Sequence, residues 1–404
     1  MAERGDRYRT PGELEGIRSM ALGVGAVGFI AWLVGVYLDP EQGLRSWLLG
    51  FVFWSGIGFG SIGLLILQYL TGGAWGVVIR RTLEAASRTL PLIFVLFLPL
   101  AVGITRLYEW THMAPTEHVI AARGWYMTAS GWIIRSVIYF AVFGVMAYLL
   151  NKWSANQDAS KDHEEAAAWL GRATAFSGPT MVIFALAVTF AAVDWVMTME
   201  PHWFSTIFGL LFVIGWALSC LCFVVIVLTF LHDKVPMDHV LGRRHFHDLG
   251  KLMLAMVMVW AYFNFSQYLI IYSGNIPEET VWFIKRSTGG WGWMAWALIL
   301  FHFAVPFLIL LQQDLKRKPR KLAAVAIFIL FMRLVDLFFY IGPSPRIHPH
   351  GPPEAFVVSW MDFVAPIAIG GFWVAYFITQ LMKRPLVPVM DPFLENAIEH
   401  GHGH

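Results

Sequence analysis

Acidic, basic and imidazole side chains stand inside long apolar stretches of this sequence. Asp194 lies in one such run, His302 in another, and a third carries Arg333 with Asp336 three positions later. A charged side chain within a membrane is costly, so an ionisable residue there indicates function by default. A carboxylate in a low dielectric has a raised pKa and exchanges protons near neutral pH, and histidine does so without help. The chemistry that these residues favour is therefore proton transfer.

A first group of polar residues gathers toward the outer ends of several apolar runs. If the N-terminus is inside, Asp194 lies in the outer part of its run, and Arg135 and Asp362 open theirs on the same side. We interpret this group as a quinol-binding site or an outer-side proton site. The alternative is structural, because Asn and Gln hydrogen-bond across membrane helices and residues near run ends are partly solvated. The candidates are Asp194, Arg135, Glu109, Asn264, Gln267, Tyr268 and Asp362.

A second group marks a candidate proton path from the inner side to mid-membrane. His247 and Asp248 lie at the inner end of one run, while the other members lie deeper. Residues three apart share a helix face, so Arg333 and Asp336 are also able to form a purely structural pair. His302 has packing as its structural alternative. The candidates for this path are His302, Arg333, Asp336, His247 and Asp248.

The composition excludes several classes of protein. Of 404 residues, 57% are hydrophobic and 14% are charged, which is typical of a polytopic membrane protein. The net charge of +2 gives no indication of nucleic-acid binding. Cys220 and Cys222 lie within an apolar run, and the sequence has no motif for covalent haem, an iron–sulfur cluster or a nucleotide. No metal site and no bound cofactor are predicted.

The apolar runs predict an all-α fold with about ten transmembrane helices. Connecting segments rich in Lys and Arg alternate with segments poor in them, so the positive-inside rule predicts both termini in the cytoplasm. The predicted organisation is a cytoplasmic N-terminal segment (1–18), a membrane domain (19–382) and a cytoplasmic tail (383–404). The runs are 19–38, 46–71, 88–107, 131–150, 174–197, 206–231, 251–273, 291–312, 321–342 and 357–382.

The segments between the runs carry further predictions. Residues 151–170 are expected to form a solvated linker or a short amphipathic helix. The Pro-rich segment 342–357, with His348 and His350, suits either docking to a rigid partner or a stiff connection. The glycines of 56–63 suit close helix packing, because small residues let backbones approach. The C-terminal His-Gly repeat is assigned no function.

Three segments carry a resemblance to a known family. They are Leu70–Gly76 followed by Arg80–Glu84, then Phe246–Lys251, and finally Tyr262–Tyr268 with Gly274–Glu279 after it. With them the chain resembles the NrfD-like (polysulfide-reductase type) integral membrane family, most closely the ActF subunits of alternative complex III. The resemblance covers nearly the whole chain. It implies two four-helix bundles plus two extra helices, in the bacterial cytoplasmic (inner) membrane.

The same resemblance implies a function and a set of partners. The implied function is quinol oxidation with menaquinol or ubiquinol as substrate, proton translocation, or both. The implied partners are a sister NrfD-like membrane subunit, an iron–sulfur/molybdopterin-like periplasmic subunit, multihaem and monohaem cytochromes c, and membrane lipid. Haem and iron–sulfur clusters belong to those partners. The alternatives are a scaffold or proton-conducting subunit without a quinol site, and a secondary transporter, although the breaks at Gly178-Pro179 and Pro306 do not form a matching pair.

Overall fold

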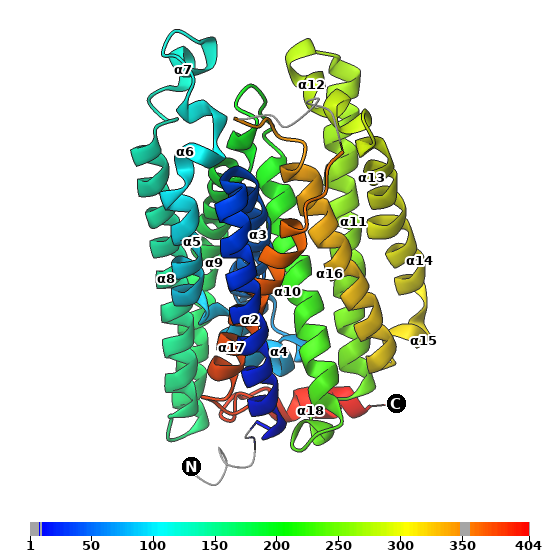
Figure 1. The fold of residues 1–404 in the computed structure, drawn as a ribbon. Helices are drawn as coiled ribbons and strands as arrows, with labels where there is room; N and C mark the ends of the chain where they lie inside the picture. The colour runs from blue at the N-terminus through cyan, green and yellow to red at the C-terminus, as the bar shows by residue number, and fades with distance from the viewer. Residues whose placement is uncertain (1–7, 9, 348–355, 404) are drawn as a thin grey trace.

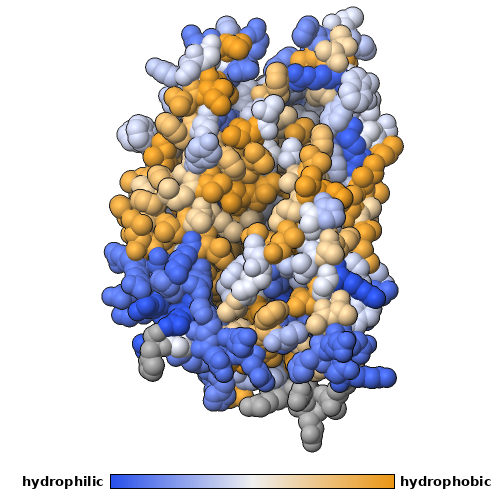
Figure 2. Space-filling view, turned by 180° about the vertical axis from the view of Figure 1, so that it is seen from behind, coloured by the Kyte–Doolittle hydropathy of each residue, from blue (hydrophilic) through white to orange (hydrophobic). Residues whose placement is uncertain are grey.

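Helices account for all the regular secondary structure in the computed structural model, which describes residues 8, 10–347 and 356–403. Within that part of the chain, nine helices are long and apolar enough to cross a membrane, or ten if a pair bent by 41° forms one span. The predicted all-α polytopic membrane fold is confirmed. In Figure 2 an apolar band lies between hydrophilic surfaces at the two ends of the molecule.

The candidate spans follow the predicted runs and extend several of them. They are α2 (Glu13–Leu38), α3 (Pro40–Thr71), α8 (Ala129–Asp158), α9 (His163–Trp195), α10 (Phe208–His232), α11 (Arg243–Gly274), α16 (Pro319–Ile341), α17 (Met361–Leu381), the continuous α13 (Trp291–Ala297), η4 (Leu298–Ala304) and α14 (Val305–Leu311), and the bent pair α4 (Ala74–Ser87) and α5 (Leu90–Val102). The shorter elements are α6 (Ile104–Leu107), η1 (Glu109–Thr111), α7 (His118–Arg123), η2 (Met197–Met199), η3 (Met237–His239), α12 (Pro277–Ser287), α15 (Gln313–Lys316) and α18 (Leu394–His402).

The spans pack as two neighbouring groups, with α2 and α17 beside them. In Figure 1, α5 and α8 lie at one side of the bundle and α11 and α14 at the other. One group is α3, α5, α8 and α9. The other is α10, α11, α13–α14 and α16. Helix α3 packs against α10 between the groups, while α2 and α17 pair with each other and cover α3. Figure 1 places α18 at one end of the bundle, here the terminus end, and α7 and α12 at the other, here the loop end.

Two predicted connections are helical instead. Helix α8 continues to Asp158 and α9 starts at His163, so only 159–162 connect them and the predicted linker 151–170 is wrong. Residues 74–87, which look like a charged loop, form α4, and most of this helix is buried. The predicted run 88–107 is divided at Gly103 into α5 and α6. Of the Pro-rich segment, residues 348–355, including His348 and His350, lie outside the described residues.

The glycines of α3 allow close packing, as predicted. A Cβ on Gly60 would lie 2.3 Å from the carbonyl oxygen of Trp216 on α10, and a Cβ on Gly63 would lie 2.7 Å from the Phe184 ring on α9. The most apolar part of α3 is 89% buried inside the protein. Small residues thus bring α3 against both neighbours, which makes it the central helix that positions the two groups.

Candidate functional site

Asp194, near the loop end of α9, is held by two residues of α8. Arg135 contacts it with two parallel hydrogen bonds, from Nε to Oδ2 at 2.8 Å and from Nη2 to Oδ1 at 2.9 Å. The hydroxyl of Tyr139 donates to Oδ2 at 2.6 Å. Asp194 is fully buried. A bidentate Arg–carboxylate pair fixes both orientation and charge. We call Asp194, Arg135 and Tyr139 the Asp194 centre.

The backbone behind this carboxylate is fixed as well. The indole Nε1 of Trp132 donates to the carbonyl oxygen of Asp194 at 2.7 Å, and the Thr198 hydroxyl donates to the same oxygen at 2.6 Å. The Tyr108 hydroxyl donates to the carbonyl oxygen of Trp195 at 2.8 Å. These bonds satisfy carbonyl groups at the C-terminal end of α9, which its own helix cannot pair. The position of Asp194 is therefore built by α8, α9 and the segment after α6.

Arg135 connects the buried carboxylate to the surface at the loop end. Its side chain is 20% exposed, and its guanidinium lies 3.6 Å from the centre of the Tyr126 ring. Its Nη1 donates to the carbonyl oxygen of Tyr126 at 2.8 Å. Burial, followed by the charge of Asp194, raises the pKa of Tyr126 to about 12, and the same two causes raise the pKa of Tyr108. Both phenols stay neutral; Tyr108 donates the hydrogen bond described above, whereas the Tyr126 hydroxyl has no hydrogen-bond partner among the described residues.

Glu109 lies outside the Asp194 centre, on η1. Its Oε2 is buried without a hydrogen-bond partner among the described residues. Desolvation by partial burial raises the pKa of this carboxyl. Glu109 is thus a partly buried carboxyl near the loop end, without a direct contact to Asp194.

A cluster of ion pairs that the sequence did not single out also lies at the loop end. Glu200, after η2, forms ion pairs with Lys285 at 3.1 Å and with Arg286 at 3.3 Å, both on α12. Arg286 also donates to the last carbonyl groups of α16, those of Phe339 at 3.0 Å and Tyr340 at 2.8 Å. Burial lowers the pKa of Arg286 to about 10, which leaves it charged at neutral pH. The sequence offered one indication of these ion pairs, because Lys285 and Arg286 are adjacent in a segment otherwise poor in positive charge.

The second group of four helices holds another buried ion pair. Arg333 and Asp336 on α16 form a hydrogen-bonded salt bridge, and the indole Nε1 of Trp260 on α11 donates to Asp336 Oδ2 at 3.1 Å. The His302 ring meets the Trp260 ring edge to face, with centroids 4.2 Å apart. All four side chains are at least 95% buried. We call them the Asp336 centre.

Several polar atoms of the Asp336 centre have no partner. Among the described residues, neither ring nitrogen of His302 and neither Nε nor Nη2 of Arg333 makes a hydrogen bond. His302 lies in the π-helical turn η4, a kind of irregularity that is frequent at functional sites. Gly215 on α10 makes room for Arg333, because a Cβ there would lie 2.3 Å from Nη2. Unpaired buried polar atoms are costly, so this arrangement is not explained by packing alone.

The other predicted candidates are distributed over the bundle. Asn264 joins the Asp336 centre, because its amide donates to the carbonyl oxygen of Trp260 at 2.9 Å and it accepts from the Tyr340 hydroxyl at 3.0 Å. Gln267 is buried on the same helix, with its Oε1 unpaired in the described structure. Tyr268 is 46% exposed and stacks on Tyr272, so it belongs to neither centre.

His247 and Asp248 lie at the terminus end and not beside the mid-membrane pair. Asp248 forms ion pairs with Lys251 at 3.1 Å and with His400 of α18 at 2.9 Å. His247 Nδ1 and Asp248 Oδ1 are 3.9 Å apart. Asp248 thus contacts α18 through His400, and the described contacts show no continuous link from either residue to Arg333 or Asp336.

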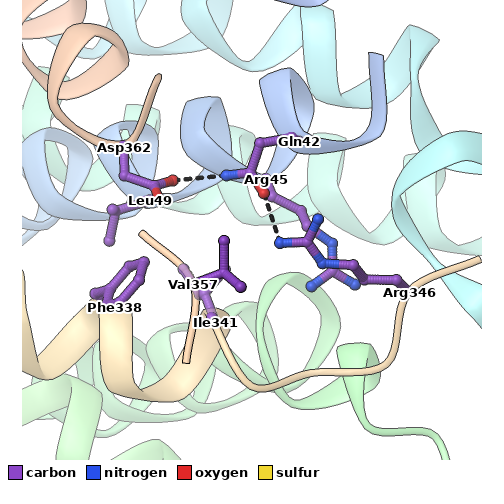
Figure 3. Close-up of a pocket in the computed structure, with 9 residues that line it drawn as sticks. Gln42, Arg45, Leu49, Phe338, Ile341, Arg346, Val357 and Asp362 are labelled. Carbon is purple, nitrogen blue, oxygen red and sulfur yellow. Dashed lines mark hydrogen bonds between the residues drawn. The ribbon is translucent and has the colours of Figure 1, made fainter. Parts of the chain in front are cut away.

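Asp362, at the start of α17, lies in a separate pocket at the loop end (Figure 3). Gln42 Nε2 and the Ser46 hydroxyl donate to its Oδ1 at 2.9 and 2.6 Å, and the backbone N–H of Ser359 donates to Oδ2 at 2.8 Å. The structure therefore distributes most of the predicted outer group over the Asp194 centre, the surroundings of the Asp336 centre and this pocket, whereas Glu109 and Tyr268 belong to none of the three.

A buried ionic network at the terminus end was also missed. Arg80 of α4 forms an ion pair with Asp391 at 2.5 Å, and Arg384 forms one with Glu84 at 3.1 Å. Arg81, next to Arg80, pairs with Glu84 at 2.7 Å and also with an aspartate of α8. The network ties the segment after α17 to α4. Two of its pairs, Arg80–Asp391 and Glu84–Arg384, join residues 311 and 300 positions apart, so spacing gave no signal for them.

No protein-family model and no curated protein matches this chain. Among the described residues, no group of three or more His, Cys, Asp or Glu side chains is arranged to hold a metal ion. The functional interpretation consequently depends on the two buried centres and their surroundings.

Proposed function

We propose that this chain is an integral membrane subunit of a quinol:cytochrome c oxidoreductase of the alternative complex III type, and that it takes protons from the quinol. The observation that supports this most directly is the Asp194 centre. A fully buried carboxylate there accepts a hydrogen bond from the Tyr139 hydroxyl and is paired with an arginine that reaches the loop-end surface. Buried ionisable groups of this kind in membrane helices mark proton relays.

The proposed chemistry requires little of the chain beyond proton transfer. Oxidation of a quinol to a quinone breaks two O–H bonds and releases two protons and two electrons. Asp194 receives one of the two protons through the Tyr139 hydroxyl, the other passes to water at the loop end, and Arg135 stabilises the carboxylate between transfers. The electrons pass to haem or iron–sulfur groups, which we assign to cytochrome c and iron–sulfur partner subunits. Both termini are proposed to face the cytoplasm, which places the loop end on the periplasmic side with those partners.

Asp194→Asn is expected to lower quinol:cytochrome c turnover of the assembled complex by at least about 100-fold. Asparagine has nearly the same shape but does not accept the proton. Turnover is measured with purified complex, and assembly is checked by subunit composition. Asp314→Asn, at an exposed position of α15, is the matched control and should keep full activity. Normal turnover of a fully assembled Asp194→Asn complex would remove Asp194 from the mechanism.

A second candidate function, proton conduction through the other group of helices, is favoured by the Asp336 centre. Among the described residues, four buried polar atoms of its histidine and arginine make no hydrogen bond. A group that alternates between partners during proton transfer needs unsatisfied donors and acceptors at rest, whereas a structural ion pair does not. We propose that His302 transfers the proton and that Arg333 and Asp336 are the charged groups beside it.

His302→Leu is expected to leave the thermal unfolding temperature within a few degrees of the parent value, because no hydrogen bond among the described residues is lost. If His302 carries protons, the number of protons released per electron should fall in reconstituted vesicles while quinol oxidation continues. Leu298→Ala, at a buried position in the same π-helical turn, tests for simple loosening of the helix. An unchanged proton yield in His302→Leu would show that the histidine only packs.

A further inference from the structure

Two arginines come together where helices α4 and α17 end. Arg88, which directly follows α4, donates from Nη2 to the carbonyl oxygen of Gln380 on α17 at 2.8 Å. Arg384, which follows α17, donates from Nη1 to Glu84 Oε2 on α4 at 3.1 Å. Each helix end thus supplies one arginine and one acceptor for the arginine of the other. The two guanidinium groups consequently lie beside the same pair of helix ends.

The negative charge at this place does not balance the two arginines. Glu84 also accepts hydrogen bonds from Arg81 at 2.7 Å and from the Ser154 hydroxyl at 2.5 Å. Arg88 has the neutral Gln380 carbonyl as its one acceptor among the described residues, and its Nε is buried without a partner there. The repulsion of Arg88 by Arg384 exceeds its attraction by Glu84. Such an arrangement favours the addition of an oxyanion.

The arginines lie at the level where the apolar parts of several spans end. Helix α17 ends at Leu381, and α5 begins at Leu90. Asn151, directly after the apolar run 131–150 of α8, donates from Nδ2 to the Ser87 hydroxyl at 2.8 Å. This level corresponds to the lipid headgroups of a bilayer. With both termini in the cytoplasm, as proposed above, it faces the inner leaflet, whose surface is negatively charged.

An exposed apolar face runs along α5 from the same place. Phe94, Val95 and Leu98 are 39%, 55% and 45% exposed, and residues three or four positions apart share a helix face. Pro91, which is also exposed, continues this face to within one turn of Arg88. An acyl chain therefore has a path along the outer surface of the protein, which needs neither an enclosed cavity nor a change in the core.

From this geometry we infer that Arg88 and Arg384 bind the phosphate of an anionic phospholipid, with an acyl chain along the exposed face of α5. Lys383, next to Arg384, is exposed and adds a third positive charge at this place. The site is separate from both buried centres and does not depend on the proposed function. An inorganic phosphate offers the same headgroup chemistry without an acyl chain, so the two sources are separable by experiment.

Native mass spectrometry of the purified full chain, titrated with phosphatidylglycerol, tests the inference. Arg88→Gln is expected to raise the Kd for phosphatidylglycerol about 10-fold, the equivalent of about 1.4 kcal/mol, and Arg88→Lys should recover part of the loss. Arg172→Gln, which removes an exposed arginine of α9 toward the terminus end, should bind as the parent does. The zwitterionic phosphatidylcholine should bind more weakly and show no dependence on Arg88.

Two results would overturn the inference. One is the same Kd for phosphatidylglycerol in Arg88→Gln and Arg172→Gln, because only a general effect of positive charge would then remain. The other is binding of inorganic phosphate that depends on Arg88 without any such binding of phosphatidylglycerol, which would replace the lipid by a free oxyanion. Competition by phosphate only at a large molar excess would support the lipid, because the apolar face then contributes to affinity.

A second variant covers the case in which Arg88→Gln lowers the unfolding temperature. Lys383→Gln changes an exposed side chain and should leave the unfolding temperature as in the parent. It is expected to raise the Kd for phosphatidylglycerol about 3-fold, since one of three positive charges is removed. An unchanged Kd in Lys383→Gln, together with the loss of folding in Arg88→Gln, would show that these cations stabilise the helix ends and do not bind lipid.

Discussion

Asp391→Ala is expected to destabilise the protein by about 3 to 5 kcal/mol, because it leaves the buried guanidinium of Arg80 without its charged partner. The two atoms of this ion pair are 2.5 Å apart, and both side chains are almost completely shielded from solvent. Gln157, the remaining partner of Arg80, offers only a neutral oxygen at 3.3 Å. The loss should appear as a lower unfolding temperature in detergent and as faster proteolysis of the segment after α17.

The matched control lies in the same segment. Glu395→Ala removes an exposed carboxylate from α18 and should change stability by less than about 0.5 kcal/mol. Equal unfolding temperatures for Asp391→Ala and Glu395→Ala would contradict the assignment of Asp391 as the anchor of this segment. A proteolysis pattern that changes at the loop end rather than near α18 would contradict it as well.

Arg333→Met is expected to have a comparable effect in the second group of helices, since it leaves the buried Asp336 carboxylate with the Trp260 indole as its one donor among the described residues. The double variant Arg333→Met/Asp336→Leu should recover most of the lost stability, because replacing both members of a buried pair by apolar residues is often neutral or stabilising. Unfolding temperatures of the parent, both single variants and the double variant provide the complete thermodynamic cycle.

This cycle separates a structural role from a functional one. If the pair serves proton transfer, the double variant folds like the parent but releases fewer protons per electron. A double variant that is as unstable as Arg333→Met would show that the guanidinium stabilises the fold through contacts other than Asp336, such as its position against Gly215 and the Phe212 ring. Normal stability together with a normal proton yield would leave the pair without a role in either process.

Hydropathy predicted the membrane helices because the bilayer requires long apolar segments with every backbone group paired internally. It failed at α4, where Arg80, Arg81 and Glu84 suggested a solvated loop. Their cost of burial is offset by partners on α8 and after α17, and such distant pairing leaves no local pattern. It failed again at residues 151–170, where polar residues extend α8 and α9 beyond the apolar parts that the hydropathy detects.

The candidate sites, too, could be predicted from the sequence only in part. Asp194 and Arg135 were both identified because a charge in an apolar run is conspicuous, but their mutual contact depends on how α8 and α9 pack. Tyr139 escaped notice because a tyrosine in a membrane helix is ordinary until it is seen to donate to a carboxylate. Asp362 was grouped with Asp194 by depth in the membrane, although the two lie in different parts of the bundle, since depth alone does not say which helices are neighbours.

The ion pair between Arg80 and Asp391 has a consequence for biosynthesis. The two residues are 311 positions apart, so at ribosomal speeds of about 5 to 20 residues per second the arginine is made on the order of 15 to 60 s before its partner. During that interval Arg80 lacks its charged partner, whereas Arg81 has Glu84 in the same helix and an aspartate of α8 only 77 positions later. We therefore expect the buried position of α4 to be completed only after the segment that carries Asp391 has been made.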